Sequence, residues 1–294
     1  MLSNYKDVYN EYLLLFEKNL SQVFSSLSTH APQTIKDAMN YAVVGGGKRI
    51  RPVLCIASAQ LLGLDFNQIK EYCVAIECIH SYSLVHDDLP SMDNDDYRRG
   101  KLSTHKKFGE ANGVLAGDAL LNFAFELCLS KPNFNSNDIN ALKFLADCSG
   151  YNGMIAGQIL DLESEGKMID ANLLYQIFEN KTAKLIIAPL VIPSLLKDKK
   201  YYKELYTFGF NLGILFQITD DIIDVEGTLE QIGKTPNKDA NSDKLTSVKV
   251  FGLEGAKEQA KLHYEQCLNA LQNVPNNEFL LELCGKVYNR KKWD

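Results

Sequence analysis

The chain has 294 residues, 46% of them apolar, so it can bury a large core and lies near the upper size of one domain. Its formal net charge of -6 excludes the broad basic surface that a nucleic-acid-binding protein needs. Seven cysteines without CxxC spacing favour buried thiols over disulfides or a zinc site. The start of the chain is charged and no run of about 18 uncharged apolar residues occurs, so we expect no signal peptide, no transmembrane segment and a cytoplasmic protein.

Apolar residues recur every three or four positions through most of the chain, which predicts helices. Clear examples, in chain order, are residues 9–27, 114–129 and 173–192. Short segments rich in helix-breaking residues separate about ten such helices, and none is long enough to link two domains. We therefore predict an all-α fold, a bundle of about ten or more helices in a single domain over residues 1–294.

The first segment with unusual chemistry is the glycine-rich turn GGGKRIRP at residues 45–52. It is not a nucleotide-binding P-loop, because Ala42 stands at the first required glycine and Arg49 replaces the Ser or Thr after the lysine. The turn brings Lys48, Arg49 and Arg51 to the start of a helix. These cations can bind an anion by charge and by forked guanidinium hydrogen bonds, although a solvated basic turn is the simpler alternative.

The next segment crowds acidic residues at the end of an apolar, helix-like run. Its five aspartates are Asp87, Asp88, Asp93, Asp95 and Asp96. Like carboxylates repel, so positive partners are required, and Arg98 and Arg99 follow at once. Because the preceding residues are apolar nearly all round, we expect a buried helix whose acidic end opens into a cavity.

Three other readings of this acidic segment are weaker. A solvated or helix-capping cluster does not explain the apolar surroundings. An EF-hand loop starting at Asp93 fails, because Tyr97 and Thr104 occupy ligand positions. A metal phosphohydrolase built on His80 and the pair His86-Asp87 lacks further histidines at ligand spacing.

A second acidic cluster ends another apolar run, LFQITDDIIDVEG at residues 215–227. Asp220 and Asp224 are four apart and share a helix face, with Asp221 adjacent. Mg²⁺ prefers carboxylate oxygens and is commonly shared with substrate phosphates, so the two clusters together could clamp a metal-bound diphosphate. No nucleophile-base pair such as GxSxG is visible, which favours chemistry by metal and charge.

Six motifs, in this order over about residues 33 to 255, resemble those of the trans-isoprenyl diphosphate synthases, most closely the bacterial farnesyl diphosphate synthases. They are GGGKRIRP, HSYSLVHDDLPSMDNDDYRRG, FGEANGVLAGDALL, GQILDLESEG, KTAKL and FQITDDIIDVEGTLEQIGK. The resemblance implies the isoprenoid synthase fold, a helical bundle around a central apolar cavity. It also implies a homodimer that condenses isopentenyl diphosphate with dimethylallyl or geranyl diphosphate.

The resemblance implies a role for each matching residue. The metal ligands would be Asp87, Asp88, Asp93, Asp220, Asp221 and Asp224, holding three Mg²⁺ ions for which Mn²⁺ can substitute. The substrate-binding residues would be Lys48, Arg51, His80, Arg98, Arg99, Lys181, Thr182, Gln217 and Lys234. Of these two sets, the catalytic residues would be Asp87, Asp88, Asp93, Lys181 and Asp220.

Product length is expected to depend on the depth of the pocket below the first aspartates. Ser83 and Tyr82 lie about one helical turn beneath Asp87. In the family, an aromatic residue at the position of Tyr82 goes with a fifteen-carbon product. The alternatives are a geranylgeranyl or geranyl diphosphate synthase, and a non-catalytic subunit that binds prenyl diphosphates.

Some residues depart from the family pattern or lie outside its assigned roles. Ser247 and Val248 replace a tyrosine and a proline that relatives often carry, which puts the contacts of that loop in doubt. Asp95 and Asp96 are expected to partner the arginines that follow them. The basic tail over residues 287–294 has two open interpretations: it covers the site or it is solvated, and the second is slightly favoured.

Overall fold

The computed structural model describes residues 4–44, 46–167, 170–226 and 245–290. Nearly all of these lie in helices, and the all-α prediction is confirmed. The chain forms two compact units, residues 1–142 and 143–294. Helix α7 (Ser136–Ser149) runs across the boundary.

The N-terminal unit contains helices and one short hairpin. They are α1 (Tyr5–Ser25), α2 (Gln33–Val44), α3 (Ile50–Leu61), α4 (Phe66–Asp87), β1 (Tyr97–Arg98), β2 (Lys101–Leu102), α5 (Thr104–Phe108) and α6 (Glu110–Leu129). The two strands pair antiparallel, with Tyr97 opposite Leu102.

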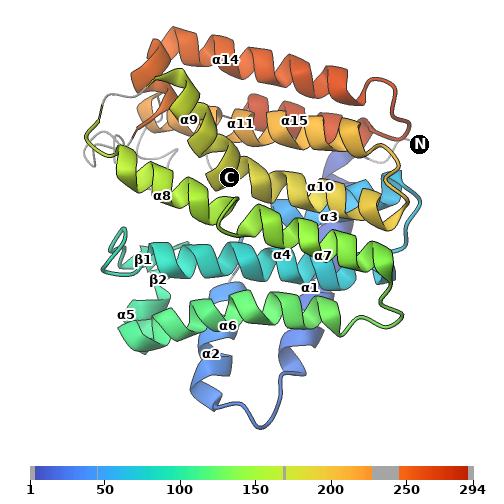
Figure 1. Cartoon of the computed structure of the whole chain (residues 1–294), viewed down its shortest axis with the longest axis vertical. Coiled ribbons are helices and arrows are strands. Elements are labelled where there is room, and N and C mark those ends of the chain that lie inside the picture. The colour runs from blue at the N-terminus through green and yellow to red at the C-terminus, as the bar shows by residue number, and fades with distance from the viewer. Residues whose placement is uncertain (1–3, 45, 168–169, 227–244, 291–294) are drawn as a thin grey trace. The chain divides into compact units, whose positions relative to one another are not determined.

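Helix α4 is the core of this unit, because its apolar residues point in nearly every direction. It packs against α1, α2, α3 and α6, and α6 runs beside it in Figure 1. The backbone N–H of Asp65 donates to the side chain of Gln68 at 2.9 Å and closes the first turn of the helix. At its other end the buried helix delivers Asp87 and Asp88. The predicted arrangement of an apolar helix with an acidic end is therefore present.

The C-terminal unit is entirely helical in its described part. Its elements are α8 (Met154–Ser164), α9 (Ala171–Ile177), the π-helix η1 (Phe178–Ala183), α10 (Lys184–Leu196), α11 (Tyr202–Glu226), α14 (Ser247–Leu271) and α15 (Glu278–Tyr288). Helix α11 packs against α10, η1, α14 and α15, and α14 runs alongside it in Figure 1. Gly213 of α11 allows the close approach to η1, because a Cβ there would lie 2.4 Å from the Cα of Ala183.

Two composition-based expectations concern the cysteines and membrane helices. All seven cysteines are buried and free, as predicted. Burial raises the pKa of the Cys148 thiol to about 12, so this thiol stays protonated and unreactive.

Helix α6 is long and apolar enough to cross a membrane by length and composition, and 33% of its most apolar window is buried. It also packs on α2 and α4, as a core helix does.

A buried polar network joins three helices of the C-terminal unit around His263. Asn211 donates to the carbonyl of Thr207, so its amide oxygen faces His263 and accepts from Nδ1 at 2.8 Å. The Nε2 atom lies 3.4 Å from the hydroxyl of Tyr175. Burial lowers the pKa of His263 to about 4, so the imidazole is neutral at pH 7.

Acid should therefore destabilise the fold through His263. In the unfolded chain its pKa is near the ordinary value of 6.5, so the stabilisation is complete above pH 6.5 and is lost as the pH falls toward 4. Between pH 7.5 and 5 the loss is about 2 kcal/mol. Urea unfolding at the two pH values should show this loss in the wild type and in the exposed-site control His30→Gln, and a smaller loss in His263→Gln. An equal loss in all three would contradict the assignment.

Candidate active site

The glycine-rich turn is held from one side by Arg99. The guanidinium of Arg99 donates to the carbonyl of Gly46 and lies directly over Gly47. Gly47 has a φ of 132°, and a Cβ there would lie 2.7 Å from Nη1 of Arg99. Glycine is therefore needed both for the backbone conformation and for the contact with the arginine.

The three cations of this turn have different environments. Arg49 is buried and forms ion pairs of 2.7 Å with Glu17 and Glu77. Its charge is already neutralised, so the expectation that Arg49 helps to bind an anion is not supported. The anion-binding capacity of the turn rests on Lys48, which is exposed, and on Arg51.

Arg51, Arg99 and His80 form a cluster with surplus positive charge. Burial lowers the pKa of Arg51 to about 10; Glu77 opposes this shift and Arg99 adds to it. Burial followed by the charges of Arg51 and Arg99 lowers the pKa of His80 well below its ordinary value. Among the described residues, the Nε atom of Arg51 is buried without a hydrogen-bond partner. Crowded cations of this kind favour a bound anion.

The first acidic motif begins at the buried end of α4. Asp88 is 2% exposed and accepts hydrogen bonds from Nε of Arg98, at 2.9 Å, and from its Nη2. Burial raises the pKa of Asp88, although Arg98 opposes the shift. Asp95 lies 3.7 Å from Arg98, as expected, but Asp96 forms its 2.8 Å ion pair with Lys106, so the prediction of an arginine partner was wrong there.

The loop after α4 folds back over the end of the helix. The backbone N–H of Asp93 donates to the carbonyl of Asp87 at 2.8 Å, and that of Asp95 donates to the carbonyl of Asp88 at 3.2 Å. These bonds bring Asp93 back beside Asp87 although they are six positions apart. The spacing of the motif is thus set by a tight backbone loop as well as by the helix.

One turn below this motif, Tyr82 contacts His86, and His86 packs against α6. Tyr82 is buried, and its ring meets that of His86 edge-on at 5.8 Å. His86 lies over Gly117, and its Nε2 is 3.0 Å from the carbonyl of Val114. This contact occupies the histidine and argues against the metal phosphohydrolase reading. Ser83 donates to the carbonyl of His80 at 2.9 Å.

In the C-terminal unit, the π-helix η1 carries Lys181 and Thr182. A π-helix is rare and often marks a functional site. The ammonium group of Lys181 donates to Asp161 of α8. Gly157 lets the two backbones touch, because a Cβ there would lie 2.1 Å from the backbone N of Lys181.

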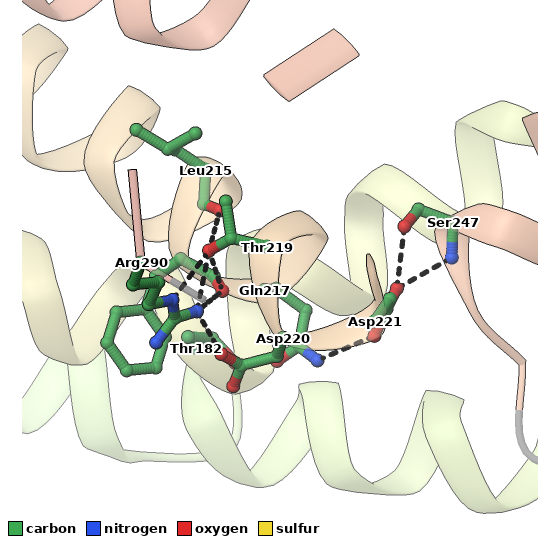
Figure 2. A network of polar contacts seen from close by, with 9 residues as sticks. Thr182, Leu215, Gln217, Thr219, Asp220, Asp221, Ser247 and Arg290 are labelled. Atoms are coloured by element: carbon green, nitrogen blue, oxygen red, sulfur yellow. Dashed lines mark hydrogen bonds and ion pairs between the residues drawn. The ribbon is translucent and has the colours of Figure 1, made fainter. Parts of the chain in front are cut away.

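A chain of hydrogen bonds runs from η1 to the second acidic motif (Figure 2). The hydroxyl of Thr182 donates to Gln217 at 3.1 Å, and the amide nitrogen of Gln217 donates to Asp221 at 3.2 Å. The other oxygen of Asp221 accepts from the backbone N–H and the hydroxyl of Ser247, at 2.7 and 2.8 Å. Ser247 thus ties the start of α14 to the motif, although it departs from the family pattern.

Arg290, just after α15, meets the same motif from another side. It donates to Asp220, to the carbonyl of Phe216 and to the hydroxyl of Thr219, and packs over the ring of Phe216 (Figure 2). Burial lowers the pKa of Arg290, and Asp220 opposes the shift. The expectation of a solvated tail was therefore wrong at this residue.

Sequence reasoning assigned no role to Asp161, Ser247 or Arg290. The signal for Asp161 was available, because it lies within the motif GQILDLESEG. A pocket in this unit is lined by Asp161 together with Lys181, Thr182, Gln217 and Asp221. Lys234 lies outside the described residues.

Both acidic motifs offer carboxylate oxygens, the ligands that Mg²⁺ prefers. Within the described ranges, no three carboxylate, histidine or cysteine side chains gather into a cage that would hold a metal by itself. Mg²⁺ commonly binds one or two carboxylates and completes its shell with water and substrate phosphates. The carboxylates present therefore fit Mg²⁺ that is shared with a bound diphosphate.

Adding one methyl group at Gly157 should disrupt the lysine site. In Gly157→Ala the new Cβ would overlap η1, and overpacking of this kind costs about 1–3 kcal/mol. Thermal unfolding should show a clear loss of stability. Gly285→Ala is the matched control, since its Cβ would meet nothing closer than 3.8 Å. Equal melting temperatures for the two variants would argue against the tight contact.

The chain is similar to one protein family and to several prenyl diphosphate synthases of known name. The model of the polyprenyl synthetase family matches residues 32–282. The farnesyl diphosphate synthase of Micrococcus luteus is 42% identical over 266 residues, covering 89% of this chain and 91% of the relative. That of Haemophilus influenzae is 41% identical, covering 92% and 94%. Geranylgeranyl pyrophosphate synthase 7 of Arabidopsis thaliana is 43% identical, covering 80% and 70%.

Solved structures agree with these relatives. A geranyltransferase from Legionella pneumophila matches with a TM-score of 0.86 at 31% identity, covering 97% of both chains. A geranyltransferase from Helicobacter pylori, complexed with magnesium and isoprenyl diphosphate, matches with a TM-score of 0.83 at 34% identity and covers 98% of both.

Proposed function

The chain belongs to the polyprenyl synthetase family, and we propose that it is a farnesyl diphosphate synthase that joins isopentenyl diphosphate to dimethylallyl and then geranyl diphosphate. Its family and its class as a prenyltransferase, both predicted from the motifs, are confirmed. The observation that supports the proposal most strongly is that the N-terminal unit places anion-binding cations and metal-binding carboxylates on neighbouring segments. A cluster of cations and a carboxylate-bearing helix end both belong to helix α4 and the segments beside it.

The cations of the basic turn are proposed to bind isopentenyl diphosphate. Lys48, Arg51 and Arg99 supply positive charge and guanidinium donors to its phosphate oxygens. Because His80 is neutral at pH 7, it donates one hydrogen bond without adding a further charge to the crowded cluster. An uncharged donor costs less to bury there than a fourth cation would.

The allylic diphosphate is proposed to bind through metal ions and a separate set of cations. The Mg²⁺ ligands are Asp87, Asp88, Asp93, Asp220, Asp221 and Asp224, and three ions, replaceable by Mn²⁺, would be held. Bound Mg²⁺ would stabilise the charge that develops on the diphosphate as the allylic C–O bond breaks. Arg98, Lys181, Thr182, Gln217 and Lys234 complete the set.

Lys181 and Thr182 have their positions fixed by neighbours, which supports this role. Asp161 holds the ammonium group of Lys181, and Gln217 accepts from the hydroxyl of Thr182. Donors held in place before the reaction need no reorganisation as charge moves onto the leaving group. The isopentenyl double bond then attacks the allylic cation, and the proton lost in the last step passes to the released diphosphate.

The oligomeric state, the domain organisation and the location are also proposals. A single catalytic domain is supported by the family match, which runs across both compact units. A homodimer in the cytoplasm is the expected setting. Exposed apolar side chains on α6, including Val114, Leu115 and Leu129, offer a surface of the kind that a second copy could cover.

Farnesyl and geranylgeranyl synthases match the chain at nearly the same identity, so product length is argued from the pocket residues. Tyr82 favours the shorter product. Its ring is buried, and the edge-on contact with His86 holds it in place. Burial, with a smaller effect of Asp87, raises the pKa of its hydroxyl to about 12, so the side chain remains neutral.

Truncating Tyr82 should lengthen the product. The purified protein is incubated with Mg²⁺, labelled isopentenyl diphosphate and dimethylallyl diphosphate, and the products are sized. The wild type should make mainly the fifteen-carbon product. Tyr82→Ala should shift at least half of the label into longer chains, because the floor of the pocket is removed. Tyr151→Ala, at a site that is 82% exposed, is the control.

Each alternative gives a different result in the same assay. A dominant twenty-carbon product from the wild type would identify a geranylgeranyl synthase and contradict the role of Tyr82. A dominant ten-carbon product would identify a geranyl synthase. Phosphate release without any carbon–carbon bond would indicate a phosphohydrolase. Tight binding of substrates without turnover would indicate a non-catalytic subunit.

A further inference from the structure

Arg49 is held in an unusual backbone conformation in the middle of the basic turn. Its φ and ψ are 53° and 32°, in the left-handed region that non-glycine residues rarely adopt. Its guanidinium donates to Glu17, to Glu77 and to the carbonyl of Val43, at 2.7, 2.7 and 2.8 Å. Burial alone would lower the pKa of Arg49, but the two carboxylates outweigh it and raise that pKa. The surrounding contacts therefore hold the strained residue and its charge in place.

Helix α1 contributes two of the contacts that fix this turn. Glu17 accepts from Nε of Arg49, and the hydroxyl of Tyr9 donates to the carbonyl of Lys48 at 2.5 Å. Burial, with a smaller effect of Glu77, raises the pKa of Tyr9 to about 12, so its hydroxyl keeps the proton that it donates. Phe16, between them in sequence, places its ring 5.7 Å from the guanidinium carbon of Arg49.

These contacts act on residues adjacent to the anion-binding cations. Lys48 precedes Arg49, and Arg51 lies two positions after it. The contacts to the carbonyl of Lys48 and to the side chain of Arg49 fix the backbone of the turn. The fixed backbone in turn sets the positions from which the side chains of Lys48 and Arg51 extend. On the other side of the turn, Arg99 holds the carbonyl of Gly46. The turn is thus clamped between α1 and Arg99.

We infer that Tyr9 and Glu17 of α1 are positioning residues for the diphosphate that Lys48 and Arg51 bind. Neither would touch the diphosphate; each acts through the turn. The segment matched by the family model begins at residue 32, so α1 lies outside it and the family match assigns nothing to these residues. The inference rests on the proposed function for the identity of the diphosphate, isopentenyl diphosphate.

The test uses Tyr9→Phe and Glu17→Gln in the full-length protein. Tyr9→Phe keeps the ring and removes only the hydrogen bond to Lys48, so it remains informative if Glu17→Gln fails to fold. Glu11→Gln is the matched control, because Glu11 is exposed on the same helix and the change removes the same charge. For each protein, KM for both substrates and kcat are measured, and calorimetry without Mg²⁺ gives the Kd of inorganic pyrophosphate.

Losing one positioning hydrogen bond should raise the KM for isopentenyl diphosphate and the Kd of pyrophosphate by about three- to tenfold. The allylic KM and kcat should stay within about twofold of wild type, as should every constant of Glu11→Gln. Unchanged constants, or an equal rise in both KM values, would overturn the inference. A wild type without turnover would instead contradict the proposed function, and the pyrophosphate measurements would still decide the positioning role.

Discussion

Charge that is buried or crowded must find opposite charge or a hydrogen bond, and this constraint determines the geometry of both units. Two apolar helices, α4 and α11, end in aspartates that cannot be left in an apolar interior by themselves. In each unit, specific side chains bind these aspartates. Arg98 holds Asp88, Gln217 and Ser247 hold Asp221, and Arg290 holds Asp220. These contacts fix the positions of the charged groups before any ligand binds.

The same constraint separates structural charges from binding charges. Arg49 is neutralised by Glu17 and Glu77, so it stabilises the turn and attracts no ligand. Burial lowers the pKa of both Arg51 and Arg99, and their positive charges repel each other. A diphosphate would relieve that repulsion. A cation held between carboxylate and phosphate oxygens would do the same at the acidic motifs.

Much of this was predictable from the sequence, because the determining patterns are local. Helical periodicity gave the all-α fold, and the four-residue spacing placed Asp220 and Asp224 on one face. The different environments of Arg49 and Arg51 were not predictable, because Glu17 and Glu77, which form ion pairs with Arg49, are distant from it in the sequence. The contact of Arg290 with Asp220 joins residues 70 positions apart and has no local signal. The close contact between η1 and α8 at Lys181 likewise depends on Gly157, which belongs to another helix.

If metal ions and cations bind one diphosphate together, their binding must be thermodynamically coupled, and this coupling can be measured. Calorimetry would give the Kd of inorganic pyrophosphate with and without saturating Mg²⁺, in the wild type and in Asp87→Asn. The wild type should bind pyrophosphate at least tenfold more tightly with Mg²⁺, about 1.4 kcal/mol of coupling, and the gain should be much smaller in the variant. An equal gain in both proteins would come from the Mg²⁺–pyrophosphate complex alone and would contradict the claim that these carboxylates hold the metal.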